Sequence, residues 1–152
     1  MQKQKSIGLV AHDNRKKDLI EWVRFNKKKL RNHLITCTGT TGQLVEEEMN
    51  KDTLGHRFEV KKMKSGPLGG DQQMGAIIAE GKIDVMVFFW DPMSAQPHDV
   101  DVKALLRLTV VYNVVTASNR ATADFIISSH LFDEDYEVKL KDYSEYIFRS
   151  LE

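Results

Sequence analysis

The stretch SGPLGGDQQ, residues Ser65–Gln73, holds the residue types best suited to chemistry in this chain. Three glycines and a proline surround one carboxylate, Asp71, directly before an amphipathic run. A glycine-rich turn that enters a helix presents backbone N–H groups to an anion. An ionised aspartate beside an anion site is unusual, because both favour the positive end of a helix. The pattern therefore favours a base that works next to a bound phosphate.

A second run, TGTTG at Thr38–Gly42, combines hydroxyls and glycines before a helix that we expect to begin near Gln43. Hydroxyl and free N–H groups can hold phosphate oxygens there, and Lys16 can add a positive charge. The run is not a Walker loop, because no lysine follows with the required spacing. The alternative is that Thr40 or Thr41 caps the helix and that Lys16 is a surface lysine.

The segment Asp91–Asp101 is a long loop with two prolines that fix its path. His98 in this loop is a candidate to polarise a carbonyl group or to carry a proton, since its usual pKa lies near physiological pH. The alternative is that Asp99 or Asp101 caps a helix that begins near Val100, and that His98 is merely exposed.

Nitrogen and oxygen ligands for a metal are present near these loops, in His12, Asp13, His98, Asp99 and Asp101. Their spacing is neither the i, i+4 pattern nor the cysteine-rich pattern of a zinc site, so we expect no metal. The single cysteine, Cys37, cannot form an internal disulfide, and we expect it to be a buried strand residue rather than a reactive thiol.

These residues must be positioned by alternating strands and helices. Apolar runs predict strands at Ile7–Ala11, Leu34–Cys37, Arg57–Met63, Val85–Trp90 and Val114–Ala117. Residues with helical spacing lie between them, namely Leu19, Trp22, Val23 and Leu30, then Met74, Ile77 and Ile78, then Leu105, Leu106 and Leu108. The alternation predicts an α/β fold of three layers, αβα, with a five-stranded, mainly parallel sheet.

The strands differ in their expected places in the sheet. Val85–Trp90 is apolar without alternation, as a central strand covered on both faces would be. The charged residues in Arg57–Met63 indicate an edge strand. Near the C-terminus we expect a short helix at Ala121–Ser128, a strand at Tyr136–Leu140 and a helix at Tyr143–Leu151.

All of the candidate residues follow predicted strands. His12 follows the first strand, Thr38–Gly42 the second, Ser65–Asp71 the third, and the loop with Asp91 and His98 the fourth. Because ligands bind at the carboxyl ends of the strands in an open parallel sheet, one site at that edge is expected to contain them all.

Length and charge narrow the classes of partner. The 152 residues suit a single domain, residues 1–152, and 22 basic residues balance 22 acidic ones. A formal charge of zero gives no overall electrostatic field that would attract nucleic acid or an anionic membrane, so a small-molecule partner is expected. Met1–Lys5 is polar, and no long apolar segment follows it, which indicates a cytoplasmic protein.

The motifs together resemble one enzyme family. LVAHD with Lys16, TGTTG, SGPLGGDQQ, FFWDPMSAQPHDVDVKALLRL and SNRATADFII are similar to the methylglyoxal synthases over about residues 6–128. The resemblance implies the Rossmann-like fold of that family and conversion of dihydroxyacetone phosphate to methylglyoxal and inorganic phosphate by a lyase. It also implies no metal or organic cofactor, a homohexamer, and cooperative inhibition by phosphate.

The resemblance assigns roles to the candidate residues. Asp71 looks like the catalytic acid/base, His98 like the group that contacts substrate oxygens and shuttles protons, and Asp101 like a further catalytic carboxylate. Asp91 looks like a supporting residue. The substrate and phosphate contacts look like His12, Lys16, Thr38, Gly39, Thr40, Thr41, Ser65, Gly66 and His98.

The sequence departs from the family pattern at two places, and its function has two alternatives. The stretch Gly42–Ser65 is longer than in the family because of Lys51–Arg57, so an extended second helix and third strand are expected. Arg149 matches a C-terminal arginine of some members, but only in an unclear register. The fold also resembles the allosteric domain of carbamoyl phosphate synthetases, which binds effectors without catalysis. An isomerase of the same triose phosphate would use similar acid/base groups.

Overall fold

Five strands occur in residues 1–52 and 55–149, which the computed structural model describes: β1 (Ser6–Ala11), β2 (Leu34–Cys37), β3 (Lys61–Lys62), β4 (Val85–Phe89) and β5 (Val115–Ala117). They form one sheet in the order β3-β2-β1-β4-β5. Every neighbouring pair runs parallel, with Leu9 opposite Cys37 on one side and Val87 on the other. The predicted α/β fold is confirmed.

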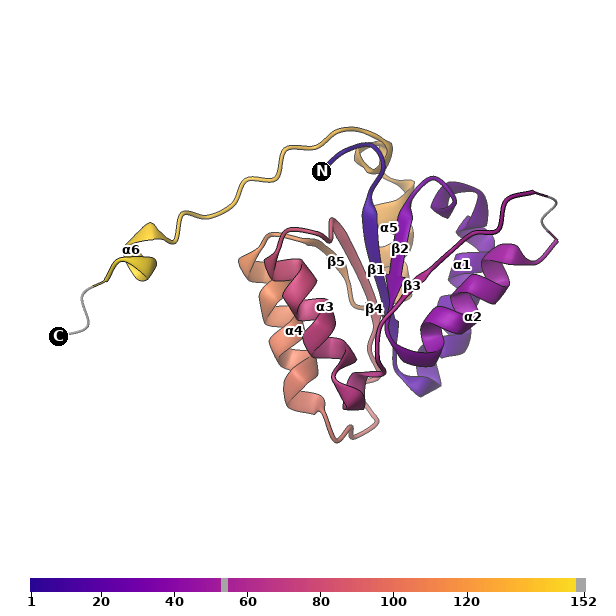
Figure 1. Cartoon of the computed structure of the whole chain (residues 1–152), viewed down its shortest axis with the longest axis horizontal. Coiled ribbons are helices and arrows are strands. Elements are labelled where there is room, and N and C mark those ends of the chain that lie inside the picture. Colours follow the sequence, from indigo (N-terminus) through magenta and orange to yellow (C-terminus); the bar gives the residue numbers. More distant parts are fainter. Residues whose placement is uncertain (53–54, 150–152) are drawn as a thin grey trace.

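Helices cover both faces of the sheet (Figure 1). The longer helices are α1 (Lys16–Leu30), α2 (Gly39–Asn50), α3 (Gly70–Ala79), α4 (Asp99–Val111) and α5 (Arg120–Ser128). The shorter turns are η1 (Asp13–Arg15), η2 (Gly66–Leu68), η3 (His130–Asp133) and α6 (Ser144–Ile147). Side chains of α1, α2 and α5 share one apolar cluster with the sheet, and those of α3 and α4 share the other.

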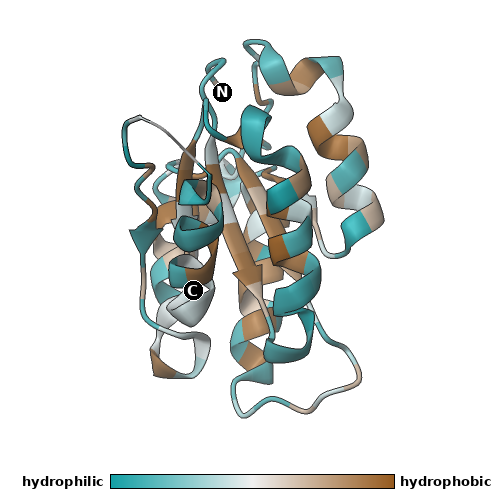
Figure 2. Ribbon diagram, turned by 90° about the vertical axis from the view of Figure 1, so that its right-hand side faces the viewer, coloured by the Kyte–Doolittle hydropathy of each residue, from teal (hydrophilic) through white to brown (hydrophobic). Residues whose placement is uncertain are grey.

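The central strand β4 supplies both clusters, because successive side chains of a strand point to opposite faces. Val85, Val87 and Phe89 pack on the side of α1, whereas Met86 and Phe88 pack on the side of α3. Figure 2 shows the strands as predominantly apolar and the helices as mixtures of polar and apolar residues. The central position predicted for this strand is confirmed.

The third strand is shorter than predicted. Pairing is limited to Lys61 and Lys62, opposite Thr36 and Cys37, so most of Arg57–Met63 is not a strand. The predicted position of this strand at the edge of the sheet is confirmed. Before the strand, the backbone N–H groups of Phe58 and Val60 donate to side chains of α2 instead of to a neighbouring strand. Helix α2 ends at Asn50 and β3 begins at Lys61, so the expected extension of these two elements by Lys51–Arg57 is wrong.

The C-terminal predictions are only partly correct. Helix α5 matches Ala121–Ser128 to within one residue, but the predicted strand Tyr136–Leu140 is wrong. Tyr136 exchanges backbone hydrogen bonds with Met1 and joins no strand of the sheet. Of the helix predicted at Tyr143–Leu151 only α6 forms, and positions 150 and 151 lie outside the described residues.

Two further features concern burial and length. Cys37 is completely buried in β2, as predicted, and burial raises the pKa of its thiol. Within residues 1–52 and 55–149 no helix has the length and apolar character needed to cross a bilayer.

Helices α1 and α2 are joined through Glu48, whose side chain is buried. Its carboxylate accepts hydrogen bonds from Arg24 Nε at 2.9 Å and from Lys51 Nζ at 2.9 Å, and these bonds lower its pKa to about 2. A carboxyl whose pKa is lower in the folded than in the unfolded protein stabilises the fold above its unfolded pKa. This stabilisation is lost as the pH falls from about 4.5 towards about 2.

We therefore expect Glu48→Gln to lower the free energy of unfolding at pH 7 by about 1–3 kcal/mol, the usual value of hydrogen bonds to a charged group. Urea unfolding at pH 7 and pH 3 measures this difference, which should be smaller at pH 3. Glu47→Gln, on the exposed side of the same helix, is the control and should change little. A difference that is equal at both pH values would contradict the role of the charge.

Candidate active site

The loops after β1, β2, β3 and β4 enclose a small pocket of about 90 Å³. The predicted site residues that line it are His12, Lys16, Thr38, Gly39, Thr40, Thr41, Ser65, Gly66, Asp71 and His98. Asp91 and Asp101 lie outside the lining. Residues from four separate segments of the sequence therefore meet at one edge of the sheet, as the order of the strands predicts.

The TGTTG motif is the first turn of α2 and not a loop before it. The helix begins at Gly39, four residues earlier than predicted, and Thr38 occupies the N-cap position without a side-chain capping bond. The first N–H groups of a helix have no acceptor within the helix, and they lie at its positive end. Thr40 Oγ1 accepts a hydrogen bond from Lys16 Nζ at 2.6 Å, so this hydroxyl and the lysine act together.

Gly39 brings this helix start against the turn that follows β3. Its φ is +50°, a conformation that favours glycine, and a Cβ atom there would lie 3.0 Å from Ser65 Cα. The Gly39 N–H donates to the carbonyls of Met63 and Lys64 at 3.2 and 3.0 Å. The two candidate phosphate-binding turns are therefore in direct contact.

Asp71 and His98 face each other in the pocket. Asp71 is in the first turn of α3 and His98 at the N-cap position of α4, and both side chains are buried. His98 Nε2 lies 3.5 Å from Asp71 Oδ2, and among the described residues Asp71 Oδ2 and His98 Nδ1 have no hydrogen-bond partner. The alternative of an exposed His98 beside a capping aspartate is wrong, because the imidazole is buried and α4 has no side-chain cap.

Gly66 makes room for this pair. A Cβ atom at Gly66 would lie 2.7 Å from His98 Nε2 and 3.2 Å from Asp71 Oδ2. A residue larger than glycine would fill the space between the candidate phosphate-binding turn and these two side chains. Glycine at position 66 therefore leaves that space open.

Opposing effects set the charge of Asp71. Burial raises the pKa of its carboxyl, nearby His98 and His12 lower it, and the charge of Asp101 raises it. Asp101 therefore acts on the pocket through its field, although it does not line it. Such a carboxylate, with a raised pKa and an unpaired oxygen in a cleft, is typical of a general acid or base.

Asp91 fixes the ring of His12. The Asp91 N–H donates to His12 Nδ1 at 3.2 Å, while the Asp91 carboxylate accepts bonds from Asn14 at 2.9 Å and from the Met93 N–H at 3.1 Å. Since Nδ1 accepts a bond, the neutral ring carries its proton on Nε2, which is buried without a partner among the described residues. His12 is therefore ready to donate to a ligand oxygen.

Sequence reasoning missed parts of the lining. Gln96, between the two prolines of the Asp91–Asp101 loop, lines the pocket, and so does Asp13, which holds Lys16 Nζ at 2.7 Å. The position of Gln96 in that rigid loop was the available signal. Within the described residues, no three or more His, Cys, Asp or Glu side chains are grouped as metal ligands.

Comparisons with known proteins agree with this geometry. Residues 18–118 match the family model of the MGS-like domain. The chain is 56% identical to the methylglyoxal synthase of Maridesulfovibrio salexigens over 99% of this chain and 100% of that protein. It is 54% identical to the methylglyoxal synthase of Pectobacterium atrosepticum over 95% of this chain and 90% of that protein.

A solved structure shows the same fold. The crystal structure of methylglyoxal synthase from Elizabethkingia anophelis NUHP1 has a TM-score of 0.90 to this chain and 49% identity, covering 100% of this chain and 95% of the other. The chain belongs to the methylglyoxal synthase family.

Arg149 is the residue that the resemblance to the methylglyoxal synthases matches to a C-terminal arginine of some members. Arg149 is exposed just after α6, where its guanidinium lies 3.7 Å from the centre of the Tyr146 ring and donates to the Tyr146 carbonyl. A contact from Arg149 to a neighbouring subunit stays a prediction.

The state of His12 can be tested directly. Burial and the nearby His98 lower the pKa of His12, so we expect a neutral ring at pH 7 with its proton on Nε2. Two-dimensional NMR of the imidazole nitrogens distinguishes the tautomers and follows their titration. A His12 that is charged at pH 7, or protonated on Nδ1 when neutral, would contradict the bond from Asp91.

Proposed function

We propose that this protein converts dihydroxyacetone phosphate to methylglyoxal and inorganic phosphate, as a carbon–oxygen lyase acting on phosphates. The observation that carries the proposal is the buried Asp71 carboxylate, with a raised pKa and an unpaired oxygen, in the same pocket as the first turn of α2. The relatives that share nearly the full chain are methylglyoxal synthases. The small pocket suits a triose phosphate better than a nucleotide.

The phosphate group binds between the two turns in contact. The N–H groups at the start of α2, the hydroxyls of Thr38–Thr41 and the Ser65–Gly66 turn surround it, and Lys16 adds a positive charge. This grip leaves the three-carbon chain to extend past Gly66 towards Asp71 and His98. The arrangement is the proximity that proton transfer from carbon requires.

Asp71 begins the reaction as a base. It removes a proton from the hydroxymethyl carbon, and the electron pair of the broken C–H bond forms an enediolate whose negative charge lies on the former carbonyl oxygen. His12 donates to that oxygen through Nε2–H, and His98 donates to the same region, which stabilises the charge as it develops. A neutral imidazole can act in this way, as one does in triosephosphate isomerase.

Phosphate then leaves. The terminal hydroxyl gives its proton to His98, its oxygen forms an aldehyde, the double bond moves one carbon along, and the C–O bond to phosphate breaks with its electron pair on phosphate. The enolate that remains takes up, on its terminal carbon, the proton that Asp71 removed, and becomes methylglyoxal. His98 passes the hydroxyl proton to the leaving phosphate, so both residues return to their starting states. Elimination requires the C–O bond to overlap the π system, so the two turns must hold the phosphate out of the enediolate plane.

We also infer a single domain over residues 1–152, a homohexamer in the cytoplasm, inhibition by inorganic phosphate, and no metal or organic cofactor. The family resemblance supports the assembly and the inhibition. The formal charge of zero supports a small-molecule ligand rather than nucleic acid or a membrane surface.

One assay separates this function from its alternatives. Chelator-treated protein is incubated with dihydroxyacetone phosphate, and inorganic phosphate, methylglyoxal and glyceraldehyde 3-phosphate are followed together. We expect equal amounts of phosphate and methylglyoxal. Glyceraldehyde 3-phosphate as the product would identify an isomerase, and no product would favour the regulatory module that only binds effectors.

Removal of the Asp71 charge tests the mechanism. We expect Asp71→Asn to fold normally and to lose about 10²–10⁴-fold in kcat, the usual contribution of a general base. Asp124→Asn, an exposed change on α5, is the control for loss of a carboxylate. Steady-state kinetics with both variants decides the point, and wild-type turnover by Asp71→Asn would remove this residue from the mechanism.

A further inference from the structure

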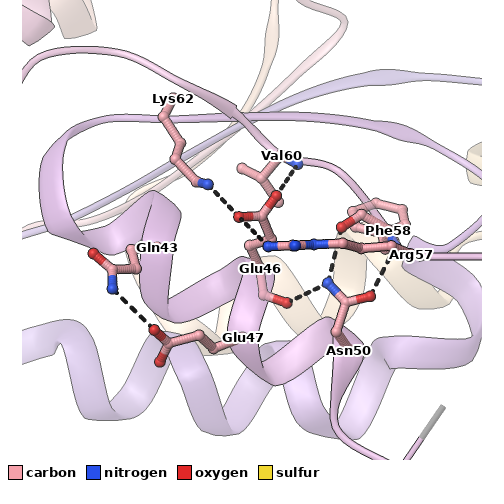
Figure 3. Close-up of polar contacts among 8 residues, drawn as sticks. All are labelled: Gln43, Glu46, Glu47, Asn50, Arg57, Phe58, Val60 and Lys62. Atoms are coloured by element: carbon pink, nitrogen blue, oxygen red, sulfur yellow. Dashed lines mark hydrogen bonds and ion pairs between the residues drawn. The ribbon is translucent and has the colours of Figure 1, made fainter.

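Polar side chains of α2 bind the segment Arg57–Lys62, which we call the edge segment and which precedes the Ser65–Gly66 turn (Figure 3). At the centre of these contacts is Glu46, a buried residue of α2. Glu46 Oε1 accepts a hydrogen bond from the Val60 N–H at 3.3 Å, and Oε2 accepts one from Lys62 Nζ. Arg57 Nη2 lies 3.8 Å from the same oxygen. One carboxylate thus binds three points of the edge segment.

Asn50, one helical turn further along α2, makes a second attachment (Figure 3). Its Oδ1 accepts from the Phe58 N–H at 2.8 Å, and its Nδ2 donates to the Phe58 carbonyl at 2.9 Å and to the Glu46 carbonyl at 2.8 Å. The Asn50 side chain therefore gives the backbone of Phe58 the two hydrogen bonds that a neighbouring strand would otherwise give. These two attachments explain why the edge segment follows α2 although so little of it pairs with β2.

Lys62 connects this cluster with the phosphate-binding turns. A Cβ atom at Gly42 would lie 2.9 Å from Lys62 Cγ, so the stem of Lys62 lies on the first turn of α2. Ser65, which contacts Gly39, follows Lys62 by three residues. The two paired residues of β3 and the bonds from the Gly39 N–H to the Met63 and Lys64 carbonyls also hold this position, so Lys62 adds a side-chain attachment to a short backbone one.

We infer that Glu46 is a positioning residue for the phosphate group of the substrate: through Lys62 and Val60 it holds the Ser65–Gly66 turn against the N-terminus of α2. This inference rests on the proposed function, because it assigns phosphate to that pocket. It predicts that loss of the Glu46 charge weakens phosphate binding while the groups that move protons stay in place.

The charge of Glu46 is essential to this role. The hydrogen bond from Lys62 lowers the pKa of Glu46, so the carboxylate is ionised at neutral pH. Glutamine has nearly the same shape and keeps one acceptor for the Val60 N–H. Its amide nitrogen, however, is a donor and would face the Lys62 ammonium, which is also a donor. Glu46→Gln therefore removes the attachment to Lys62 and keeps the one to Val60, with little change in packing.

The matched control is Glu47→Gln. Glu47 is the next residue of α2 and is exposed, and it accepts a bond from Gln43 at 3.0 Å on a different side of the helix from the edge segment (Figure 3). Both variants lose one negative charge from the same turn. They differ in whether the lost charge touches Lys62.

Calorimetry with inorganic phosphate and steady-state kinetics with dihydroxyacetone phosphate test the inference. For Glu46→Gln we expect the Kd for phosphate and the KM to rise about tenfold, within the range by which residues beyond direct contact alter affinity, while kcat changes less than about twofold. Glu47→Gln should match the wild type. A Glu46→Gln variant with the wild-type Kd, or with kcat reduced and Kd unchanged, would overturn the inference.

Lys62→Met tests the same contact without a change in α2, and Lys62 is partly exposed, so it guards against a folding defect in Glu46→Gln. We expect its Kd to rise as well, and the double variant to bind no more weakly than the weaker single variant. Fully additive losses would overturn the coupling. If the wild type yields no product, the proposed function fails, whereas the comparison of Kd values still decides the role of Glu46.

Discussion

The contact between Gly39 and Ser65 is the constraint on which the site depends. The sheet order places β2 between β1 and β3, so the start of α2 and the turn after β3 reach the same edge. Because Gly39 has a φ of +50° and no side chain, the two turns approach closely enough to surround one phosphate group, as proposed above. Gly66, also without a side chain, then leaves the way open to His98 and Asp71.

The aspartate beside an anion site has a physical explanation. Asp71 is in the first turn of α3, where a helix favours negative charge, yet burial and the charge of Asp101 raise its pKa. His98 and His12 act in the opposite direction. Burial thus makes the Asp71 carboxylate a stronger base than a fully solvated aspartate, while the two histidines favour its ionised form. Both effects suit the proposed role of a group that first accepts and later returns a proton.

Much of this arrangement could be predicted from the sequence, because strand length and helical spacing determine which residues follow which strand. The start of α2 at Gly39 was not predicted, because glycine has a low helix propensity and usually lies before a helix. Here the close contact with Ser65 requires a glycine in the first turn of the helix. The short β3 was missed because side chains of α2, Glu46 and Asn50, replace its ladder. The place of Gln96 in the pocket lining was not predicted, because it depends on the path of a loop, and loops have no periodic sequence pattern.

A crystal structure with inorganic phosphate bound is the most direct test of the central claim, that two touching turns hold the phosphate while Asp71 faces the space beside it. The account predicts phosphate oxygens within hydrogen-bond distance of the N–H groups of Thr40 and Thr41 and of the Ser65–Gly66 turn, with Lys16 turned to the anion, while the Gly39 N–H keeps its bonds to Met63 and Lys64. A phosphate bound at one turn alone, at another edge of the sheet, or in place of the Asp71–His98 contact would contradict it.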